Sequence, residues 1–346
     1  MIHIELYSRR HHLKQILTGF HLFGLKTGER IKIVDCSKST TVNTIACLVY
    51  YNGKKIVYDV QDGYQDFESM KYLLGICDFY FKRNFSAAEN EKLRSRIEQK
   101  QDVDKMYPLG FNYTVTYQWS PLNYGTPWKE HLKRFLGYKN TPNAYFKPEV
   151  FEGVPDYDGK DPTIFFQTRL WDIPEEYPEW KKEQWNWINN TRLSIIRTLK
   201  REFPNQFDGG LIDNGIDHKF APELLLPKSV TQRETYIEHM KKSDICIGTT
   251  GLHMSIGGKT GEYVAAARAI VHEKFYYTVT GDFEEGKNYL EFTDADQCIE
   301  AVYKLIDNPD LIYNMQKNNY EYYKKYLEPC QLIINTLEIV EGEKIL

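Results

Sequence analysis

The sequence lacks any uninterrupted apolar run of about 18 residues, the length from which a membrane-spanning helix is built. It has no excess of positive charge either, since 44 Lys and Arg stand against 48 Asp and Glu, a net charge of −4. That balance argues against nucleic acid as a partner bound through bulk charge. The N-terminus opens on the alternating Ile2, Ile4 and Leu6 and lacks the apolar core of a signal peptide. We therefore expect a cytoplasmic protein, and peripheral association with the inner face of a membrane stays open.

Cysteine pairs and metal-ligand patterns are absent as well. The six cysteines are scattered, no Cys-x-x-Cys pair occurs, and most lie in apolar runs where a thiol packs as a small hydrophobic group. None of the three Asp-x-Asp strings follows a strong buried strand, and no Cys/His ligand cluster is visible. The strings are Asp102–Asp104, Asp156–Asp158 and Asp294–Asp296. We expect no metal site and no cofactor.

Two successive series of strand-like and helix-like segments are present. Apolar runs of strand composition alternate with segments of helical spacing over 1–160, and again over 161–330. Between about 120 and 160, five prolines accompany many Gly, Asn and Tyr residues, as in a surface excursion. Alternation of strands and helices is typical of α/β sheets. The sequence therefore predicts the α/β class, with two Rossmann-like domains facing across a cleft.

Local patterns predict several elements of these series. Asn52-Gly53 between the β-rich runs 43–50 and 54–60 predicts a hairpin. Charge spacing predicts a helix over 87–101, and composition predicts a strand over 111–117.

The densest signal lies between Ser243 and Glu273. A buried strand ends at Gly248, a loop of small and polar residues follows, and a helix begins near Lys259–Glu262. Such an arrangement presents backbone N–H groups and a helix N-terminus to an anion. Lys259 would add a positive charge for phosphate, and Glu262 could accept hydrogen bonds from paired hydroxyls. The alternative is a packed Gly-rich turn whose Glu is favoured by the helix dipole.

A P-loop is a competing interpretation of the same loop. Gly258-Lys259-Thr260 matches the end of a Walker pattern, but His253 stands where the first glycine is required. The pattern is therefore incomplete, and a nucleoside triphosphatase is the less favoured interpretation.

The string K-x-x-E-Y-x-A-A-x-R-A-I-V at Lys259–Val271 resembles the donor-site segment of group 1 glycosyltransferases with the GT-B fold. Gly286–Tyr289 and Asn308–Asp310 resemble later landmarks of that family, so the likeness covers roughly Thr163–Pro329. Tyr80–Arg83 and Tyr107–Phe111 look similar to the N-terminal halves of capsule and lipopolysaccharide transferases. Two departures are Met254, where the family often carries Glu, and Ala267-Arg268-Ala269, where it carries Gly-x-Pro.

The resemblance implies that a nucleotide-sugar binds to the domain at 161–330, and that 331–346 packs back on the N-terminal domain. Lys259 and the loop residues Thr249, Thr250 and Gly251 would then neutralise the diphosphate, while Glu262 would bond ribose or sugar hydroxyls. Arg169, at the end of a strand, would stabilise the leaving diphosphate as negative charge develops on it. A surface ion pair with Asp172 is the alternative for Arg169. His253 could touch the phosphate or the sugar.

Acid–base and acceptor residues are expected in the N-terminal domain. Asp62 follows an apolar strand and could take the proton of an acceptor hydroxyl, or it could be a turn residue beside Gly63. Arg9, Arg10 and His11, followed by His12, come after the first strand. They could bind an acceptor phosphate, or they could be a solvated run that opens a helix.

The function that these patterns and the resemblance imply is metal-independent transfer of a sugar from a nucleotide diphosphate sugar to a glycan or lipid-linked acceptor, as in polysaccharide biosynthesis. Two alternatives stay open. One is a nucleotide-sugar epimerase or hydrolase of the same fold, and the other is a non-catalytic scaffold that binds a nucleotide-sugar.

Overall fold

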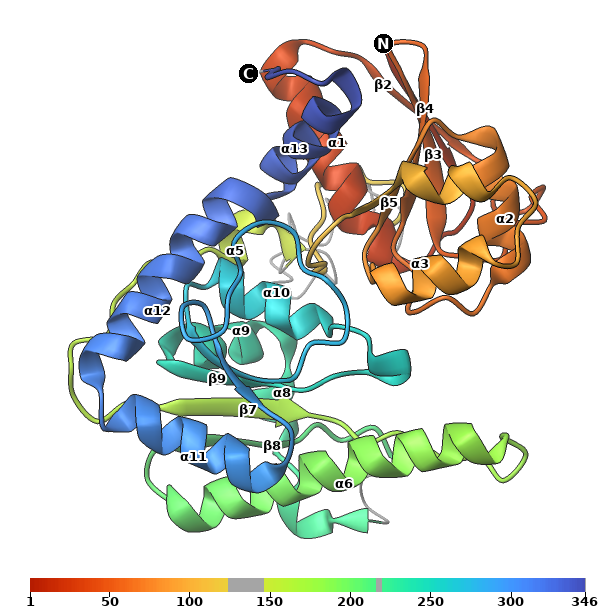
Figure 1. Ribbon diagram of the computed structural model, residues 1–346. Helices are drawn as coiled ribbons and strands as arrows, with labels where there is room; N and C mark the ends of the chain where they lie inside the picture. The colour runs from red at the N-terminus through yellow and green to blue at the C-terminus, as the bar shows by residue number, and fades with distance from the viewer. Residues whose placement is uncertain (124–145, 216–219, 346) are drawn as a thin grey trace, which may run out of the picture. The chain divides into compact units, whose positions relative to one another are not determined.

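The computed structural model describes residues 1–123, 146–215 and 220–345 (Figure 1). The chain divides into two compact units, and each is described by itself. Unit 1 comprises Met1–Val150, Tyr277–Gly281 and Lys324–Leu346, and unit 2 comprises Phe151–Tyr276 and Asp282–Tyr323. Most of the excursion predicted at 120–160 lies outside the described residues. In the described ranges, no helix is both long and apolar enough to cross a membrane.

Unit 1 is built on a sheet with the strand order β2-β1-β3-β4-β5-β6. Its strands are β1 (Ile2–Leu6), β2 (Ile31–Asp35), β3 (Ala46–Tyr51), β4 (Lys54–Asp59), β5 (Phe79–Lys82) and β6 (Met106–Pro108). The predicted hairpin is confirmed, because Asn52 and Gly53, with φ of 46° and 77°, join β3 to β4. β3 is antiparallel to β1 and β4, whereas the other pairs are parallel. The carboxyl ends of all strands but β3 therefore share one edge.

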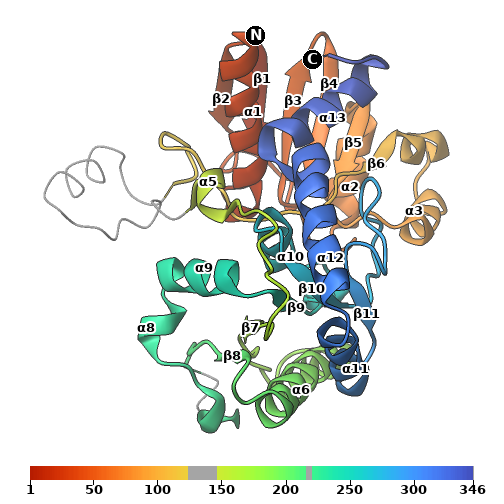
Figure 2. The same ribbon diagram turned by 90° about the vertical axis from the view of Figure 1, so that its left-hand side faces the viewer.

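Helices α1 (Lys14–Thr27) and α13 (Pro329–Glu341) cover one face of this sheet and lie side by side (Figure 2). They approach closely at Gly19, where a Cβ atom would stand 2.2 Å from the Pro329 carbonyl oxygen. The other face is covered by α2 (Phe67–Ile76). The apolar side chains of α13, among them Ile333 and Leu337, are buried in the same core as those of β1 and α1. Burial of apolar surface stabilises a fold by about 25 cal/mol per Å², so α13 is an integral part of unit 1.

Two local predictions for unit 1 were wrong. The helix expected over 87–101 is divided into α3 (Ala87–Arg94), capped by the Ser86 side chain, and the 3₁₀ segment Lys100–Lys105. The strand expected over 111–117 does not form. Over 111–117 the backbone bonds to partners outside the sheet, because the Tyr113 amide donates to the Gln15 side chain at 3.3 Å and the Thr116 amide donates to the Phe146 carbonyl at 2.5 Å.

Unit 2 is built on a wholly parallel sheet with the order β11-β10-β9-β7-β8. Its strands are β7 (Ile164–Thr168), β8 (Phe207–Leu211), β9 (Ile245–Gly248), β10 (Ala269–Glu273) and β11 (Leu290–Phe292). β7, β9 and β10 are buried along their whole length, as expected for central parallel strands. The strand order reverses between β7 and β9, and ligands of α/β sheets bind beyond the carboxyl ends at such a switch point.

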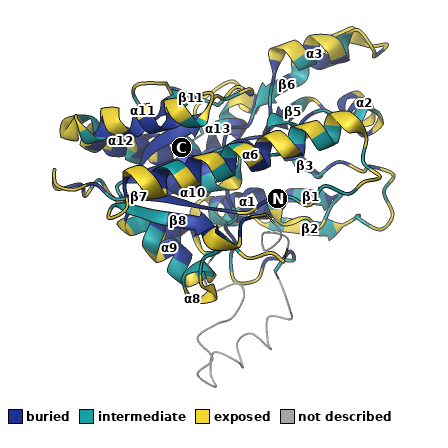
Figure 3. Ribbon diagram, turned by 90° about the horizontal axis from the view of Figure 1, so that it is seen from below, coloured by how far each residue is buried: buried dark blue, intermediate teal, exposed yellow. Residues whose placement is uncertain are grey.

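Helices cover both faces of the unit 2 sheet. α6 (Glu179–Glu202) and α11 (Ala295–Ile306) share one core with the sheet, and Figure 3 shows exposed and buried stretches alternating along α6. α9 (Arg233–Lys242) and α10 (Gly258–Ala265) supply Tyr236 and Tyr263, whose rings contact Phe165 of β7 on the opposite face. The remaining elements of the described residues are α5 (Pro148–Phe151), α8 (Lys228–Thr231), α12 (Pro309–Tyr322) and short 3₁₀ or π segments. The predicted α/β class, with two sheet-centred halves, is confirmed.

Candidate nucleotide-binding site

Arg192 joins the two loops at the switch point of unit 2. Its guanidinium donates to the Arg169 carbonyl at 2.8 Å and to the Thr250 carbonyl at 3.2 Å. A third bond, at 3.3 Å, runs to the Thr249 hydroxyl. Arg192 comes from the middle of α6 and is buried. The loops after β7 and β9 are therefore held together by one cation that no sequence pattern had singled out.

The amides of Thr250 and Gly251 are engaged within the protein. The Thr250 amide and hydroxyl donate to the Glu273 carboxylate at 2.8 and 2.7 Å, and the Gly251 amide donates to the Ser255 carbonyl at 2.8 Å. Burial raises the pKa of Glu273 above its ordinary value, against the effect of the Thr250 hydrogen bonds. These two amides shape the loop, so a phosphate would depend on other donors.

The N-terminus of α10 supplies such donors. Gly257 caps the helix without a side-chain hydrogen bond, and the first turn carries no acidic residue. The macrodipole therefore presents partial positive charge at this end without an internal counter-charge. The His272 imidazole fixes the turn, because its Nε2 lies 2.9 Å from the Thr260 hydroxyl.

Lys259 stands in the first turn of α10, and its ammonium donates to the Gln167 carbonyl of β7. The pKa of Lys259 is lowered to about 7, mainly by burial. Glu262 acts in the opposite direction, while Arg192, Arg233 and Arg169 lower the pKa further. Four cations thus gather around the carboxyl ends of β7 and β9. An anionic ligand would restore the positive form of Lys259.

Glu262 is buried and paired with Arg233 from the start of α9. The Arg233 Nη2 lies 2.6 Å from Oε1, and its Nη1 lies 3.3 Å from Oε2, a bidentate arrangement. Arg233 also stacks over the rings of Phe151 and Tyr236, at 4.9 and 5.2 Å from their centroids. A carboxylate has about four lone-pair sites, so Glu262 keeps acceptor capacity for ligand hydroxyls. Arg233 is the second site residue that sequence reasoning missed.

His253 and Met254 lie in the loop after β9 with a left-handed backbone, each with φ of 58°. The His253 backbone amide donates to the Gln184 side chain of α6 at 3.1 Å. The pKa of the His253 imidazole is lowered by burial and, to a smaller extent, by the charge of Lys181. Non-glycine residues in this region cost of order 1 kcal/mol, and such strain often accompanies functional sites. His253 thus lies within the predicted donor loop itself.

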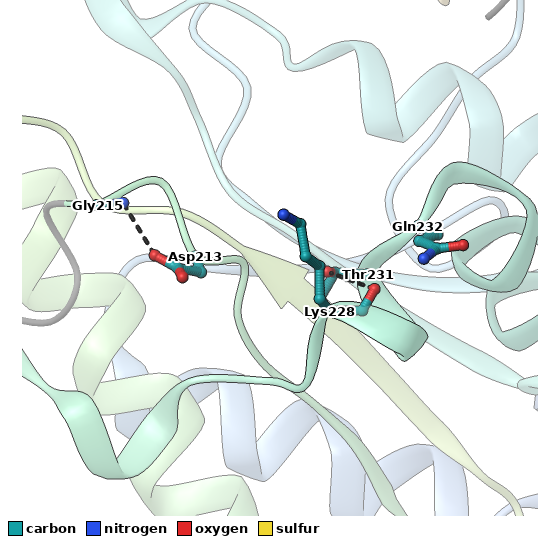
Figure 4. Close-up of a pocket in the computed structure, with 5 residues that line it drawn as sticks. All are labelled: Asp213, Gly215, Lys228, Thr231 and Gln232. Atoms are coloured by element: carbon teal, nitrogen blue, oxygen red, sulfur yellow. Dashed lines mark hydrogen bonds between the residues drawn. The ribbon is translucent and has the colours of Figure 1, made fainter.

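Two pockets open near the carboxyl ends of β7 and β8. The first, of about 410 Å³, is lined by Asp213, Gly215, Lys228, Thr231 and Gln232. In Figure 4 the Lys228 side chain extends between Asp213 and Thr231. The second, of about 270 Å³, is lined by Arg169, Leu170, Trp171, Asp172, Pro174, Tyr177, Trp185 and Asn214. Arg169 is exposed there, and its guanidinium stacks over the Trp171 ring at 4.8 Å.

The predicted acceptor and base residues lie at the shared edge of the unit 1 sheet. Asp62, after β4, pairs with Arg83, after β5. Arg9 donates to Asp35 at 2.5 Å and to the Pro121 carbonyl at 2.8 Å. Arg10 and His11 are exposed. In the described residues, no group of three or more His, Cys, Asp or Glu could hold a metal ion.

No protein-family model matches the sequence, and no curated protein matches it. Among solved structures, it is similar to the C-terminal domain of the group 1 glycosyltransferase LpcC from Francisella tularensis. That match has 17% identity and a TM-score of 0.34, and covers 51% of this chain and 96% of that one. Anabaena HepE in complex with UDP-glucose matches with 11% identity and a TM-score of 0.40, over 80% of this chain and 68% of that one. A Rickettsia africae glycosyltransferase matches with 12% identity and a TM-score of 0.40, over 93% of this chain and 73% of that one.

Proposed function

We propose that unit 2 binds a nucleotide diphosphate sugar, and that the protein transfers the sugar to a glycan or lipid-linked acceptor without a metal ion. The observation that carries this proposal is the gathering of Arg169, Arg192, Arg233 and Lys259 around the α10 N-terminus. A diphosphate leaving group gains negative charge as the glycosidic bond breaks, and fixed cations lower that barrier. The Lys259 pKa of about 7 marks a cation whose positive form a bound diphosphate would stabilise.

Each residue has a role in this proposal. Lys259 and Arg169 contact the diphosphate, and Arg192 positions the loops that carry Arg169 and Thr250. Glu262, oriented by Arg233, accepts hydrogen bonds from ribose or sugar hydroxyls. In unit 1, Asp62 takes the proton of the acceptor hydroxyl. A role in polysaccharide biosynthesis, at the cytoplasmic face of a membrane, belongs to the same proposal.

A thermal-shift screen followed by a transfer assay tests the proposal. The panel is UDP, GDP, TDP, CMP and ADP, each with and without magnesium, on the wild type, on Glu262→Gln and on the control Lys304→Met. Lys304 is an exposed α11 residue. A ligand at 100 times its Kd stabilises by about 2.7 kcal/mol. We expect one diphosphate to stabilise the wild type and the control equally, with and without magnesium. The same diphosphate should stabilise Glu262→Gln less.

The sugar-loaded form of that nucleotide then separates the reactions. Transfer to an acceptor supports the proposal, whereas release of free sugar without acceptor indicates a hydrolase. An epimerised donor indicates an epimerase, and binding without turnover indicates a scaffold. The absence of a shift with every nucleotide would overturn the donor site itself.

A further inference from the structure

The second pocket of unit 2 has no role in the proposed chemistry, apart from that of Arg169. It has a volume of about 270 Å³, and the side chains that concern us here are three aromatic ones and three polar ones: Trp171, Tyr177, Trp185, Arg169, Asp172 and Asn214. They come from the segment between β7 and α6, from α6 itself and from the segment after β8. Three separate parts of the unit 2 sequence therefore meet around one hollow.

Two asparagine side chains hold the wall of this pocket in place. The side chain of Asn189, which is buried in α6, accepts from the Trp171 amide at 2.8 Å and donates to the Trp171 carbonyl at 2.9 Å. The Asn214 side chain donates to the Leu170 carbonyl at 2.8 Å. The loop that carries Trp171 is thus ordered before any ligand arrives, which reduces the entropy that binding must cost.

The aromatic rings of the pocket meet at steep angles. Tyr177 packs edge-on against Trp185 at 85°, with 5.1 Å between the ring centroids, and Trp171 is tilted by 42° against Trp185 at 5.8 Å. Arg169 stacks over Trp171 and Lys181 over Tyr177, at 4.8 and 3.7 Å from the centroids. A nucleobase binds by stacking flat on an aromatic face, and neither ring pair forms a parallel slot for one. Inclined apolar walls suit a puckered ring better than a flat one.

Both indole N–H groups of the pocket lack a partner. The Nε1 atoms of Trp171 and Trp185 are buried and have no hydrogen-bond partner among the described residues. An indole nitrogen is a donor only, and a buried donor without an acceptor costs about 1–3 kcal/mol. A ligand oxygen that either group reaches through a small rotation of its ring would remove that cost.

The polar side chains of the pocket favour a ligand that both donates and accepts hydrogen bonds. Asp172 is exposed, and its carboxylate accepts from the Ile173 amide at 3.1 Å. A carboxylate has about four lone-pair sites, so Asp172 keeps capacity for further donors. Its negative charge disfavours an anionic ligand here. Hydroxyl groups satisfy carboxylates as donors and indoles as acceptors. A molecule that combines several hydroxyls with an apolar, puckered ring is a sugar.

We propose that this pocket binds one sugar ring. Trp171 and Tyr177 supply apolar surface to the C–H groups of the ring, while Asp172 and Asn214 bond its hydroxyls. The volume of about 270 Å³ lies below the roughly 300–1,000 Å³ of sites for drug-sized ligands, as a single ring requires. Binding of a sugar stands on the pocket itself, whereas the part of that sugar in the reaction rests on the proposed transferase function. The ring belongs either to a glycan or to the sugar of the donor, and the test distinguishes these sources.

The test uses ¹⁹F NMR of the full chain labelled with fluorotryptophan. The variants Trp171→Phe, Trp185→Phe and Trp187→Phe assign the signals, and Trp187 serves as the control because it is exposed on α6 and does not line the pocket. The glycan probes are maltohexaose, cellohexaose and N-acetylchitohexaose, followed by free glucose, galactose, mannose and rhamnose. The donor probe is UDP-glucose, with UDP as its sugar-free control.

We expect at least one sugar probe to shift the Trp171 and Trp185 signals and to leave the Trp187 signal unchanged. Its Kd should be at least tenfold weaker in Trp171→Ala, followed through Trp185, and in Asp172→Asn, followed through Trp171. Trp187→Ala should bind as the wild type does. Because Asp172 is exposed, its variant decides the question even where Trp171→Ala fails to fold.

A matched aspartate gives the contrary outcome a clear form. Asp307→Asn changes an exposed aspartate that follows α11 and does not line the pocket. Equal Kd values in Asp172→Asn and Asp307→Asn would overturn the proposal. So would a Trp171 signal that no sugar probe shifts, or one that UDP shifts as much as UDP-glucose while every free sugar leaves it in place.

The probes also separate the two sources of the ring and keep this pocket distinct from the donor site. A shift with an oligosaccharide in the absence of nucleotide assigns the pocket to a glycan. A shift with UDP-glucose alone, absent with UDP, assigns it to the sugar of the donor. Failure of the nucleotide screen would refute the donor site and leave the oligosaccharide titration readable, whereas nucleotide binding without any sugar shift would refute this pocket alone.

Discussion

The Glu262 carboxylate accepts a hydrogen bond from each terminal nitrogen of Arg233, at 2.6 and 3.3 Å. Residue 262 was expected to meet ligand hydroxyls directly, and the structure adds a cation that fixes its orientation before any ligand arrives. A carboxylate held in one rotamer loses less freedom on binding, so Arg233 preorganises the acceptor for ribose or sugar hydroxyls.

Arg233→Met should destabilise unit 2 and weaken nucleotide binding together. Removing one partner of a buried pair costs about 3–5 kcal/mol. We expect a smaller loss than this range, about 2–3 kcal/mol, because the Arg233 side chain is 27% exposed. Urea denaturation measures the loss. Arg233→Lys, which keeps the charge but not the fork, should lose less stability and still weaken nucleotide binding. Unchanged stability and affinity in both variants would refute the positioning role.

Nucleotide affinity should fall as the pH rises above about 7. The folded-state pKa of Lys259 is lowered to about 7, mainly by burial, so its positive charge is lost through this range. Affinity then drops by at most about tenfold per pH unit, since one pKa unit corresponds to 1.36 kcal/mol. Lys259→Arg, which stays charged, should flatten the profile between pH 7 and 9. Calorimetry across that range measures it, and equal slopes in both proteins would contradict the assignment.

The same lysine gives the folding stability a pH dependence of defined sign. Above pH 7 the unfolded chain, with an ordinary lysine pKa near 10.4, binds more protons than the folded chain. The contribution of Lys259 therefore raises the free energy of unfolding from pH 7 toward pH 10. Lys259→Met should lack this component in urea titrations, and a difference of the opposite sign would contradict the lowered pKa.

Gly248→Ala should damage the donor loop through His272. A Cβ at residue 248 would stand 2.1 Å from the His272 ring, which is fully buried and bonded to Thr260. Overpacking of this kind costs about 1–3 kcal/mol. The displaced ring would shift the first turn of α10, so nucleotide binding should fall with stability. Denaturation and nucleotide titration together check this, and a neutral variant would show that the ring can move aside.

A matched pair of glycines tests the packing of α13 in unit 1. Gly19→Ala should destabilise by at least about 1–3 kcal/mol, because its Cβ would meet the Pro329 carbonyl and the Ile333 side chain. Gly75→Ala, also in a helix but with nothing within 4 Å of its Cβ, should stabilise by about 0.5–1 kcal/mol. Urea denaturation compares them. Equal effects would show that α1 and α13 do not meet closely.

Short sequence patterns correctly predicted features that depend on neighbouring residues alone. Asn52-Gly53 predicted the hairpin because its φ values suit those residues, and a strand, a glycine-rich loop and a helix were found at residues 245–265 as expected. The hairpin implies that β3 is antiparallel to β4. No sequence pattern predicts that β3 also pairs with β1.

Long-range partners of the site were beyond the sequence. Arg192 meets Thr249 across 57 residues, and Arg233 meets Glu262 across 29. Neither arginine belongs to a spaced motif, because its contacts are made with residues that the fold brings to it from elsewhere in the sequence. Arg192 lies on α6, and no sequence pattern could show which loop carbonyls its guanidinium would meet.

Calorimetric titration of the full chain with the stabilising nucleoside diphosphate, in EDTA, tests the central claim most directly. The wild type should bind it with an affinity that EDTA leaves unchanged. Lys259→Met should bind at least tenfold more weakly, and the control Lys304→Met should match the wild type. The absence of heat with any diphosphate, or equal affinity in Lys259→Met and the wild type, would contradict the account of unit 2 as a nucleotide-sugar site.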